Sequence, residues 1–126
     1  MTDQQLITAA LLAQKNAYVP YSKFPVGAAV LTKSGKVFTG CNVENASYGS
    51  TTCAERTAIA KAVSEGEREF SAIAIVCGSG EYCSPCGSCR QIITEFGEDI
   101  RVLMANKDGE YREKLSAELL PGFFKL

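Results

Sequence analysis

Residues 71–77 read Ser-Ala-Ile-Ala-Ile-Val-Cys, an almost unbroken apolar run around which the rest of the chain can be arranged. A run of this length and composition is typical of a strand that is buried on both faces. Such a strand belongs at the centre of a sheet whose two faces are covered. The sequence therefore predicts a sheet with residues 71–77 in a central position.

Two segments with helical character flank this strand in the chain, and a third lies near the start of the sequence. Residues 53–64 are rich in alanine, which suits a helix that packs closely on a sheet. Residues 84–96 begin with Ser-Pro, in which serine can cap a helix and proline can occupy its first turn. A Thr2-x-x-Gln5 capping box precedes apolar residues at helical spacing. Three helices are therefore predicted.

Four further segments have the character of strands. Residues 26–33 and 36–41 flank Ser34-Gly35, a spacer with the chemistry of a hairpin turn. Residues 100–105 form a fourth strand, and Asp108-Gly109 turns the chain into a short fifth one. Because helices and strands alternate along the chain, we expect a layered α/β fold in which helices cover a sheet.

The size and charge of the chain limit the classes of function. A chain of 126 residues can bury a core of its own, so residues 1–126 are expected to form one domain. A net charge of -1 gives no general attraction for nucleic acid or for a lipid surface. The amino terminus lacks a secretory signal, and no stretch reaches the ~18 apolar residues of a membrane span. We expect a cytoplasmic protein with a small substrate.

Six cysteines and no histidine make sulfur the main metal ligand available to this chain. In a reducing compartment, clustered cysteines are more often metal ligands or catalytic thiols than disulfides. Cys86 and Cys89 lie three residues apart at the start of a predicted helix, where the helix dipole favours thiolates. Cys53 begins the other buried helix. If the two helix starts meet, three thiolates could bind Zn²⁺ and leave its fourth position open to activate water.

The other cysteines are weaker candidates. Cys83 precedes Pro85 and lies outside the predicted helix, so it is interpreted as a bystander. Cys41 and Cys77 end apolar strands and are expected to be buried as small hydrophobic residues. Three alternatives stay open on the motifs alone: a dithiol of the thioredoxin type, an iron–sulfur cluster, and a closed structural zinc site with four cysteines.

Polar residues near the cysteines suggest further parts of a site. Glu55 could belong to a Thr52-x-x-Glu55 capping box, but beside a metal ligand it is also a natural proton carrier. Arg56 could donate to a ligand sulfur and offset its negative charge, or it could be a solvated helix residue. Asn42 and Glu44 alternate after a strand and could grip a hydroxylated substrate, although turn structure alone would explain them.

Several of these motifs together resemble a known family. The segments Tyr21-Ser22-Lys23-Phe24, Asn42-Val43-Glu44-Asn45, Cys53-Ala54-Glu55-Arg56, Pro85-Cys86-x-x-Cys89-Arg90-Gln91 and Leu119-Leu120-Pro121-Gly122 are similar to those of small, homotetrameric cytidine deaminases with three zinc-binding cysteines. The resemblance implies a three-layer α/β/α sandwich with a mixed five-stranded sheet. It also implies pyrimidine salvage by zinc-dependent hydrolysis of cytidine and 2'-deoxycytidine to uridine and 2'-deoxyuridine, the reaction type described for zinc deaminases.

The resemblance also implies a role for each matched residue. Cys53, Cys86 and Cys89 would bind one Zn²⁺ per chain, and Glu55 would move protons between water, ring N3 and the departing amine. By the same resemblance, the substrate would be held by Phe24, Asn42, Glu44, Ala54 and Ser84, the thiolates would accept hydrogen bonds from Arg56, and the pocket would be completed between subunits by Tyr48 and Phe124. A deaminase of the blasticidin S type, which shares the zinc motif, is the second choice.

Overall fold

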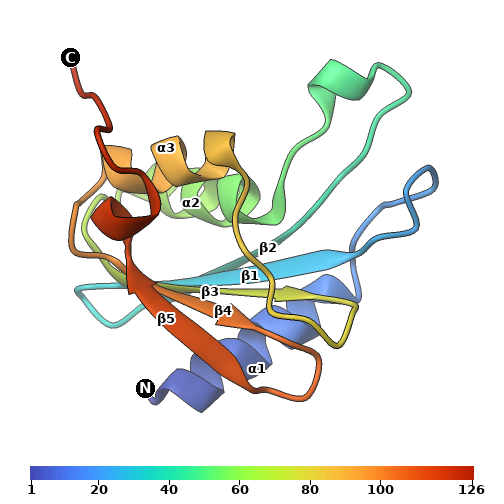
Figure 1. Ribbon diagram of the computed structural model, residues 1–126, viewed down its shortest axis with the longest axis horizontal. Helices are drawn as coiled ribbons and strands as arrows, with labels where there is room; N and C mark the ends of the chain where they lie inside the picture. The colour runs from blue at the N-terminus through green and yellow to red at the C-terminus, as the bar shows by residue number, and fades with distance from the viewer.

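The computed structural model describes residues 1–126, and a five-stranded sheet forms its centre (Figure 1). The strands are β1 (Val26–Thr32), β2 (Val37–Cys41), β3 (Phe70–Cys77), β4 (Arg101–Ala105) and β5 (Tyr111–Leu115). Their order is β2-β1-β3-β4-β5, and only the β3–β4 pair is parallel. The prediction of a mixed sheet with residues 71–77 at its centre is therefore confirmed.

Helices cover both faces of this sheet (Figure 1). Helix α1 (Asp3–Gln14) lies on one face, and α2 (Ala54–Ser64) and α3 (Gly87–Glu95) lie on the other. Side chains alternate along β3, so that Ala74 packs in the cluster of α1 while Ile73 and Ile75 pack in that of α2 and α3. The apolar run thus fills two cores at once, which gives the expected three-layer α/β/α sandwich.

The helix starts agree with the sequence in two cases and differ in one. The Thr2 capping box forms at the start of α1, and α2 begins directly after Cys53. The prediction that α3 begins at Ser84-Pro85 is wrong, because α3 begins at Gly87 with Cys86 as its N-cap. The Ser84 hydroxyl and the Pro85 carbonyl instead accept hydrogen bonds from the Arg90 side chain. Residues 84–86 therefore enter α3 as a non-helical segment.

Close packing against the sheet sets the position of α2. A Cβ atom on Gly40 of β2 would lie 2.5 Å from the backbone nitrogen of Ala58 and 2.6 Å from the carbonyl oxygen of Ala54. Only glycine allows the strand and the helix to approach this closely. The start of α2 is consequently held against the end of β2. No helix of the structure has both the length and the apolar character needed to cross a lipid bilayer.

Candidate active site

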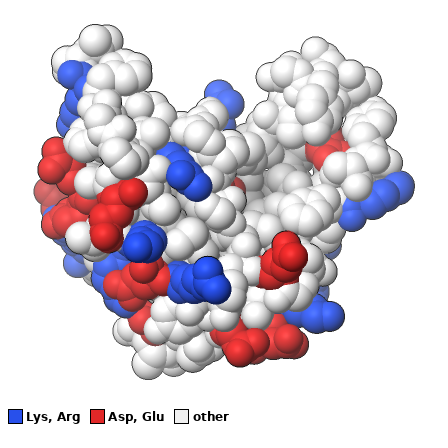
Figure 2. Space-filling view, in the orientation of Figure 1, with Lys and Arg blue, Asp and Glu red and all other residues white.

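A cavity of about 520 Å³ lies where the starts of α2 and α3 meet the carboxyl end of β3. In Figure 2 the molecule is hollowed between the carboxyl-terminal segment on the left and, on the right, the β2–α2 loop that carries the short helix η1 (Tyr48–Ser50). The volume is within the usual range for a small-molecule site. The lining residues are Ser22, Phe24, Val26, Asn42, Glu44, Tyr48, Thr51, Cys53, Ala54, Glu55, Cys77, Ser79, Glu81, Tyr82, Cys83, Ser84 and Cys86.

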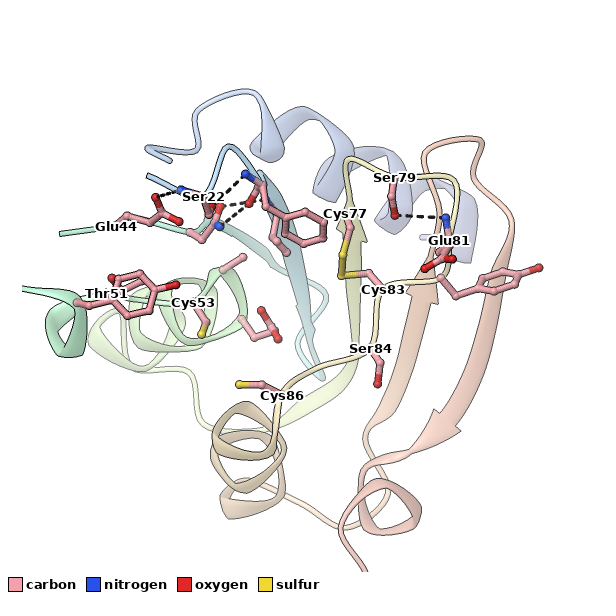
Figure 3. A pocket seen from close by; sticks show the side chains of 17 residues that line it. Ser22, Glu44, Thr51, Cys53, Cys77, Ser79, Glu81, Cys83, Ser84 and Cys86 are labelled. Atoms are coloured by element: carbon pink, nitrogen blue, oxygen red, sulfur yellow. Dashed lines mark hydrogen bonds between the residues drawn. A yellow bond between two sulfur atoms is a disulfide. The ribbon is translucent and has the colours of Figure 1, made fainter. Parts of the chain in front are cut away.

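Three cysteine sulfurs gather beside this cavity, and two of the cysteines, Cys53 and Cys86, line it. Cys53 is the N-cap of α2, Cys86 is the N-cap of α3, and Cys89 lies in the first turn of α3. Their Sγ atoms all lie within 4.8 Å of one another. Tetrahedral zinc with Zn–S bonds of about 2.3 Å needs sulfurs about 3.8 Å apart, so the donor set fits Zn²⁺ after a small adjustment. In Figure 3, Cys53 and Cys86 point toward each other from the two helices.

The local environment affects the three thiols differently. Burial raises the pKa of Cys53 and of Cys89, and the nearby Glu55 carboxylate adds to the effect in both. Burial also opposes ionisation of Cys86, but hydrogen bonds from the Cys89 backbone and from neighbouring thiols leave its pKa lowered. A bound divalent cation deprotonates coordinating thiols outright. All three thiols are therefore expected to be thiolates when a metal is bound, although only the pKa of Cys86 is lowered without it.

Glu55 lies in the first turn of α2 and lines the same cavity. Its side chain is only 5% exposed, and burial raises the pKa of its carboxyl group. The alternative of a Thr52 capping box does not hold, because the N-cap is Cys53 and no side chain caps the helix. Glu55 is thus a buried carboxyl group next to a metal-binding cluster, with a pKa shifted toward the range useful for proton transfer.

Asn42 and Glu44 line the cavity, but their polar atoms already hold the neighbouring loop. Asn42 Oδ1 accepts from the Val26 amide, and its Nδ2 donates to the Phe24 carbonyl, both at 2.9 Å. The Glu44 carboxylate accepts from two backbone amides, those of Tyr21 and Ser22, each at 3.1 Å. The Ser22 side chain and these amides lower the pKa of Glu44. Any contact with substrate would use the lone pairs that these bonds leave free.

The remaining predicted residues divide between the cavity and the surface. Phe24, Ala54 and Ser84 line the cavity, as does Tyr48, whose side chain is 69% exposed. Phe124 lies outside the lining and is 67% exposed, with its carbonyl bonded to Gln91. Two large aromatic side chains, those of Tyr48 and Phe124, are therefore left facing solvent in the single chain.

The structure does not bring Arg56 onto the sulfur cluster. Its side chain is exposed and forms neither a hydrogen bond to a cysteine nor an ion pair. The buried face of α2 consists of Ala54, Glu55, Ala58, Ile59 and Ala62, and Arg56 lies outside this face. The expected hydrogen bonds from Arg56 to the thiolates are absent from this structure.

Cys77 is buried, and Cys83 lies outside the metal-binding cluster, as expected, but the expectation that both are free thiols is wrong. Cys77 at the end of β3 forms a disulfide with Cys83, and their Cα atoms lie 5.4 Å apart. The bond closes a loop whose residues Ser79, Glu81 and Tyr82 line the cavity (Figure 3). Sequence reasoning missed it because the expected reducing compartment argued against disulfides. Cys41, by contrast, is free and half-buried.

Comparison with known proteins gives consistent matches over nearly the whole chain. Residues 1–105 match the family described as "Cytidine and deoxycytidylate deaminase zinc-binding region". A cytidine deaminase of Sporosarcina psychrophila is 50% identical over 125 residues, covering 98% of this chain and 92% of the relative. The crystal structure of cytidine deaminase from Burkholderia pseudomallei superposes with a TM-score of 0.95 at 50% identity, covering 98% of this chain and 100% of that one.

A relative with a different substrate in its name is more distant. The blasticidin-S deaminase of Bacillus cereus is 34% identical over 108 residues, covering 79% of this chain and 76% of the relative. The matches to cytidine deaminases are both longer and more similar.

Proposed function

The chain belongs to the family defined by the cytidine and deoxycytidylate deaminase zinc-binding region, and from this premise we propose that Cys53, Cys86 and Cys89 hold the metal while Glu55 carries the protons. The protein is a zinc-dependent hydrolase that deaminates cytidine. The observation that carries the residue assignment is the meeting of three thiols and a buried carboxyl group at one end of a single cavity.

The proposed chemistry divides between the metal and the protein. Cys53, Cys86 and Cys89 would hold the zinc, which when bound would supply a water nucleophile near neutral pH. Glu55 accepts a proton from the attacking water and gives it to ring N3, then accepts the second proton from the new C4 hydroxyl group and gives it to the leaving amine. A C4–O bond forms and the C4–N bond breaks, so cytidine and water become uridine and ammonia. A pKa raised by burial suits Glu55 to both accepting and donating a proton.

The charge of the cavity supports a free nucleoside as substrate. Its lining includes the carboxyl groups of Glu44, Glu55 and Glu81 and no lysine or arginine. A phosphorylated substrate would meet these carboxylates without a compensating cation. We therefore assign cytidine and 2'-deoxycytidine as substrates, held by Phe24, by the free lone pairs of Asn42 and Glu44, and by the backbone of Ala54 and Ser84.

The test of this function is an ultraviolet assay of the zinc-loaded protein with four compounds. Loss of the 4-amino chromophore is expected with cytidine and 2'-deoxycytidine, and at least tenfold slower with cytidine 5'-monophosphate or blasticidin S. Removal of zinc with a chelator should abolish the reaction, and added Zn²⁺ should restore it. Faster turnover of blasticidin S than of cytidine would contradict the proposed substrate.

The proposal extends to assembly and location. We infer a homotetramer of 126-residue catalytic domains with shared active sites, because the exposed Tyr48 and Phe124 side chains lie free in the single chain. Light scattering of the active enzyme tests this, and a fully active monomer would contradict it. A cytoplasmic location is supported by the four free thiols, three of which are the proposed zinc ligands, whereas the Cys77–Cys83 disulfide argues against it. Assaying fractions of the source cells tests the location.

A further inference from the structure

Arg90 of α3 directs its side chain at three acceptors in two separate parts of the chain. Its Nε donates to the Pro85 carbonyl, one terminal nitrogen donates to the Ser84 hydroxyl, and the other donates to the Leu119 carbonyl. Each distance is 2.9 Å. Neither ion pair of the structure includes Arg90, so its cation has no carboxylate partner. The residue is engaged entirely in hydrogen bonds to neutral groups.

The backbone of Arg90 adds a fourth bond in the same direction. Its amide donates to the carbonyl of Cys86 at 3.0 Å. Three consecutive residues, 84, 85 and 86, therefore all accept hydrogen bonds from Arg90. No other residue donates to the Ser84 hydroxyl or to the Pro85 carbonyl. The bond to Cys86 is the backbone bond of the first helical turn, and the Arg90 side chain supports Ser84 and Pro85 in the segment that leads into α3.

This segment contributes directly to the cavity and has little other support. Ser84 and Cys86 line the cavity and lie on one stretch of backbone beside the Cys77–Cys83 disulfide (Figure 3). The segment is not helical. The Cys89 amide supports Cys86 at its end, but Ser84 and Pro85 accept hydrogen bonds from no residue other than Arg90. Groups that bind a ligand must be held within about 0.5 Å of the productive geometry. A non-helical backbone therefore needs hydrogen bonds from neighbouring residues to hold it in place. Arg90 is the support that the structure provides for Ser84 and Pro85.

We propose that Arg90 is a positioning residue for the deamination: it holds the Ser84–Cys86 backbone in the geometry that binds the nucleoside, and ties it to the carboxyl-terminal segment at Leu119. This inference rests on the proposed function of the same cavity. Arginine suits the task because its planar guanidinium offers five N–H donors in a fixed fork. Lysine keeps the charge but, as a single ammonium group, does not reach three acceptors in this arrangement.

The experiment compares Arg90→Lys with the wild-type enzyme in steady-state assays on cytidine, with zinc content and Tm measured on the same preparations. Loss of bonds from a charged donor is expected to raise KM about tenfold or more, because each 1.4 kcal/mol corresponds to a factor of ten. The kcat should change less than about threefold, since the lost interaction serves the bound ground state and the transition state alike. Zinc should stay at one per chain.

Two more variants make the test specific. Arg68→Lys, at an exposed arginine without hydrogen bonds, is the matched control and should keep the wild-type KM. Ser84→Ala removes one acceptor, should raise KM by itself, and should make the effect of Arg90→Lys smaller in the double variant than in the single one. If Arg90→Lys does not fold, the KM of Ser84→Ala decides the question.

The outcomes separate this proposal from the proposed function. A lower Tm with unchanged KM in Arg90→Lys, or an unchanged KM in Ser84→Ala, would overturn the positioning of the segment by Arg90 while the deaminase assignment stands. A zinc-loaded wild-type enzyme that leaves cytidine unchanged would overturn the proposed residue assignment, and the Arg90 proposal with it.

Discussion

Glu55 shows how one residue acquires a chemical task from its surroundings. The side chain is held at the start of α2, where it is nearly buried, lines the cavity and accepts a hydrogen bond from the Cys89 thiol. Burial raises the pKa of its carboxyl group, and the same cavity gives it access to substrate. A carboxyl group in this setting can be proton acceptor and donor in turn.

Replacing this carboxyl group tests the assignment directly. Glu55→Gln keeps the size and shape of the side chain but cannot transfer a proton, so kcat is expected to fall by about 10²–10⁴-fold. Zinc content, measured by atomic absorption, should stay at one per chain because Glu55 is not among the three clustered donors. Glu65→Gln at the exposed end of the same helix is the control. Near-normal turnover of Glu55→Gln would exclude Glu55 as the proton carrier.

At the scale of elements, the site depends on two helix starts that are brought to one place. Helix α2 approaches β2 at Gly40, and α3 begins only after the segment supported by Arg90. Cys53 and Cys86 are the two N-caps, so the position of each helix decides where its sulfur lies. A shift of either helix would therefore change the distance between the Cys53 and Cys86 sulfurs and weaken metal binding.

A methyl group at the contact between β2 and α2 should disturb both stability and the metal site. In Gly40→Ala the new Cβ would meet backbone atoms of Ala54 and Ala58, which cannot move aside alone. The free energy of unfolding is expected to fall by about 1–3 kcal/mol, the usual cost of overpacking. Urea denaturation measures this, and zinc affinity should fall in parallel. Gly49→Ala, where the added Cβ meets open space, is the control; equal stability of the two variants would contradict the packing argument.

The loop closed by the Cys77–Cys83 disulfide offers a second test at this scale. Joining residues six apart removes chain entropy from the unfolded state, which the loop-closure relation puts at about 2 kcal/mol. The double variant Cys77→Ala/Cys83→Ala is expected to lose about this stability without reductant, with a higher KM because the loop lines the cavity.

Alkylation provides the accompanying chemical readout. Unfolded, metal-free wild-type protein should take up four alkyl groups before reduction and six afterwards, because four of the six cysteines are free. Uptake of six groups without reduction would show that the bond is absent. Cys41→Ala, which removes a free thiol outside the pair, is the matched control for stability.

At the scale of the whole molecule, an ion-pair network joins the two ends of the chain. Arg101 in β4 contacts Asp3 of α1 at 2.7 Å and Glu113 of β5 at 2.8 Å. The hydrogen bond from Arg101 is the main cause that lowers the pKa of each carboxyl group. Tyr111 also donates to Asp3. Helix α1 is thus tied to β4 and to β5, the edge strand nearest the carboxyl terminus.

This network predicts a pH dependence of stability with a definite sign. Both carboxyl groups have folded pKa values below their ordinary values of 3.8 and 4.5, so the unfolded chain binds more protons as the pH falls. The contribution is fully present above about pH 5 and is lost as the pH falls through the lowered values. Because the side chains are 29–39% exposed, we expect only about 1 kcal/mol in total.

Urea denaturation between pH 2 and pH 7 tests this sign. Arg101→Gln should be less stable than wild type at pH 7, and the difference should close toward pH 2. Arg68→Gln, at an arginine without an ion pair, should show no such difference. A gap between Arg101→Gln and wild type that widens as the pH falls would contradict the network.

The local pattern of residues in the sequence was enough to predict most of the secondary structure and one pair of metal ligands. The apolar run at 71–77, the Ser34-Gly35 turn and the Thr2 capping box each depend on neighbours in the sequence, and each appears in the structure. The three-residue spacing of Cys86 and Cys89 likewise predicted a common face at one helix start. Secondary structure and chelating pairs are visible in sequence because their geometry repeats over a few residues.

The tertiary structure alone decided the rest. Cys53 lies 33 residues before Cys86 in the chain, and only the packing of two helices on one sheet brings their sulfurs together. The same packing turned Arg56 to solvent and gave Arg90 its acceptors at Ser84, Pro85 and Leu119. Contacts between distant segments depend on how whole elements fill a shared core, and no local pattern of residues encodes that arrangement.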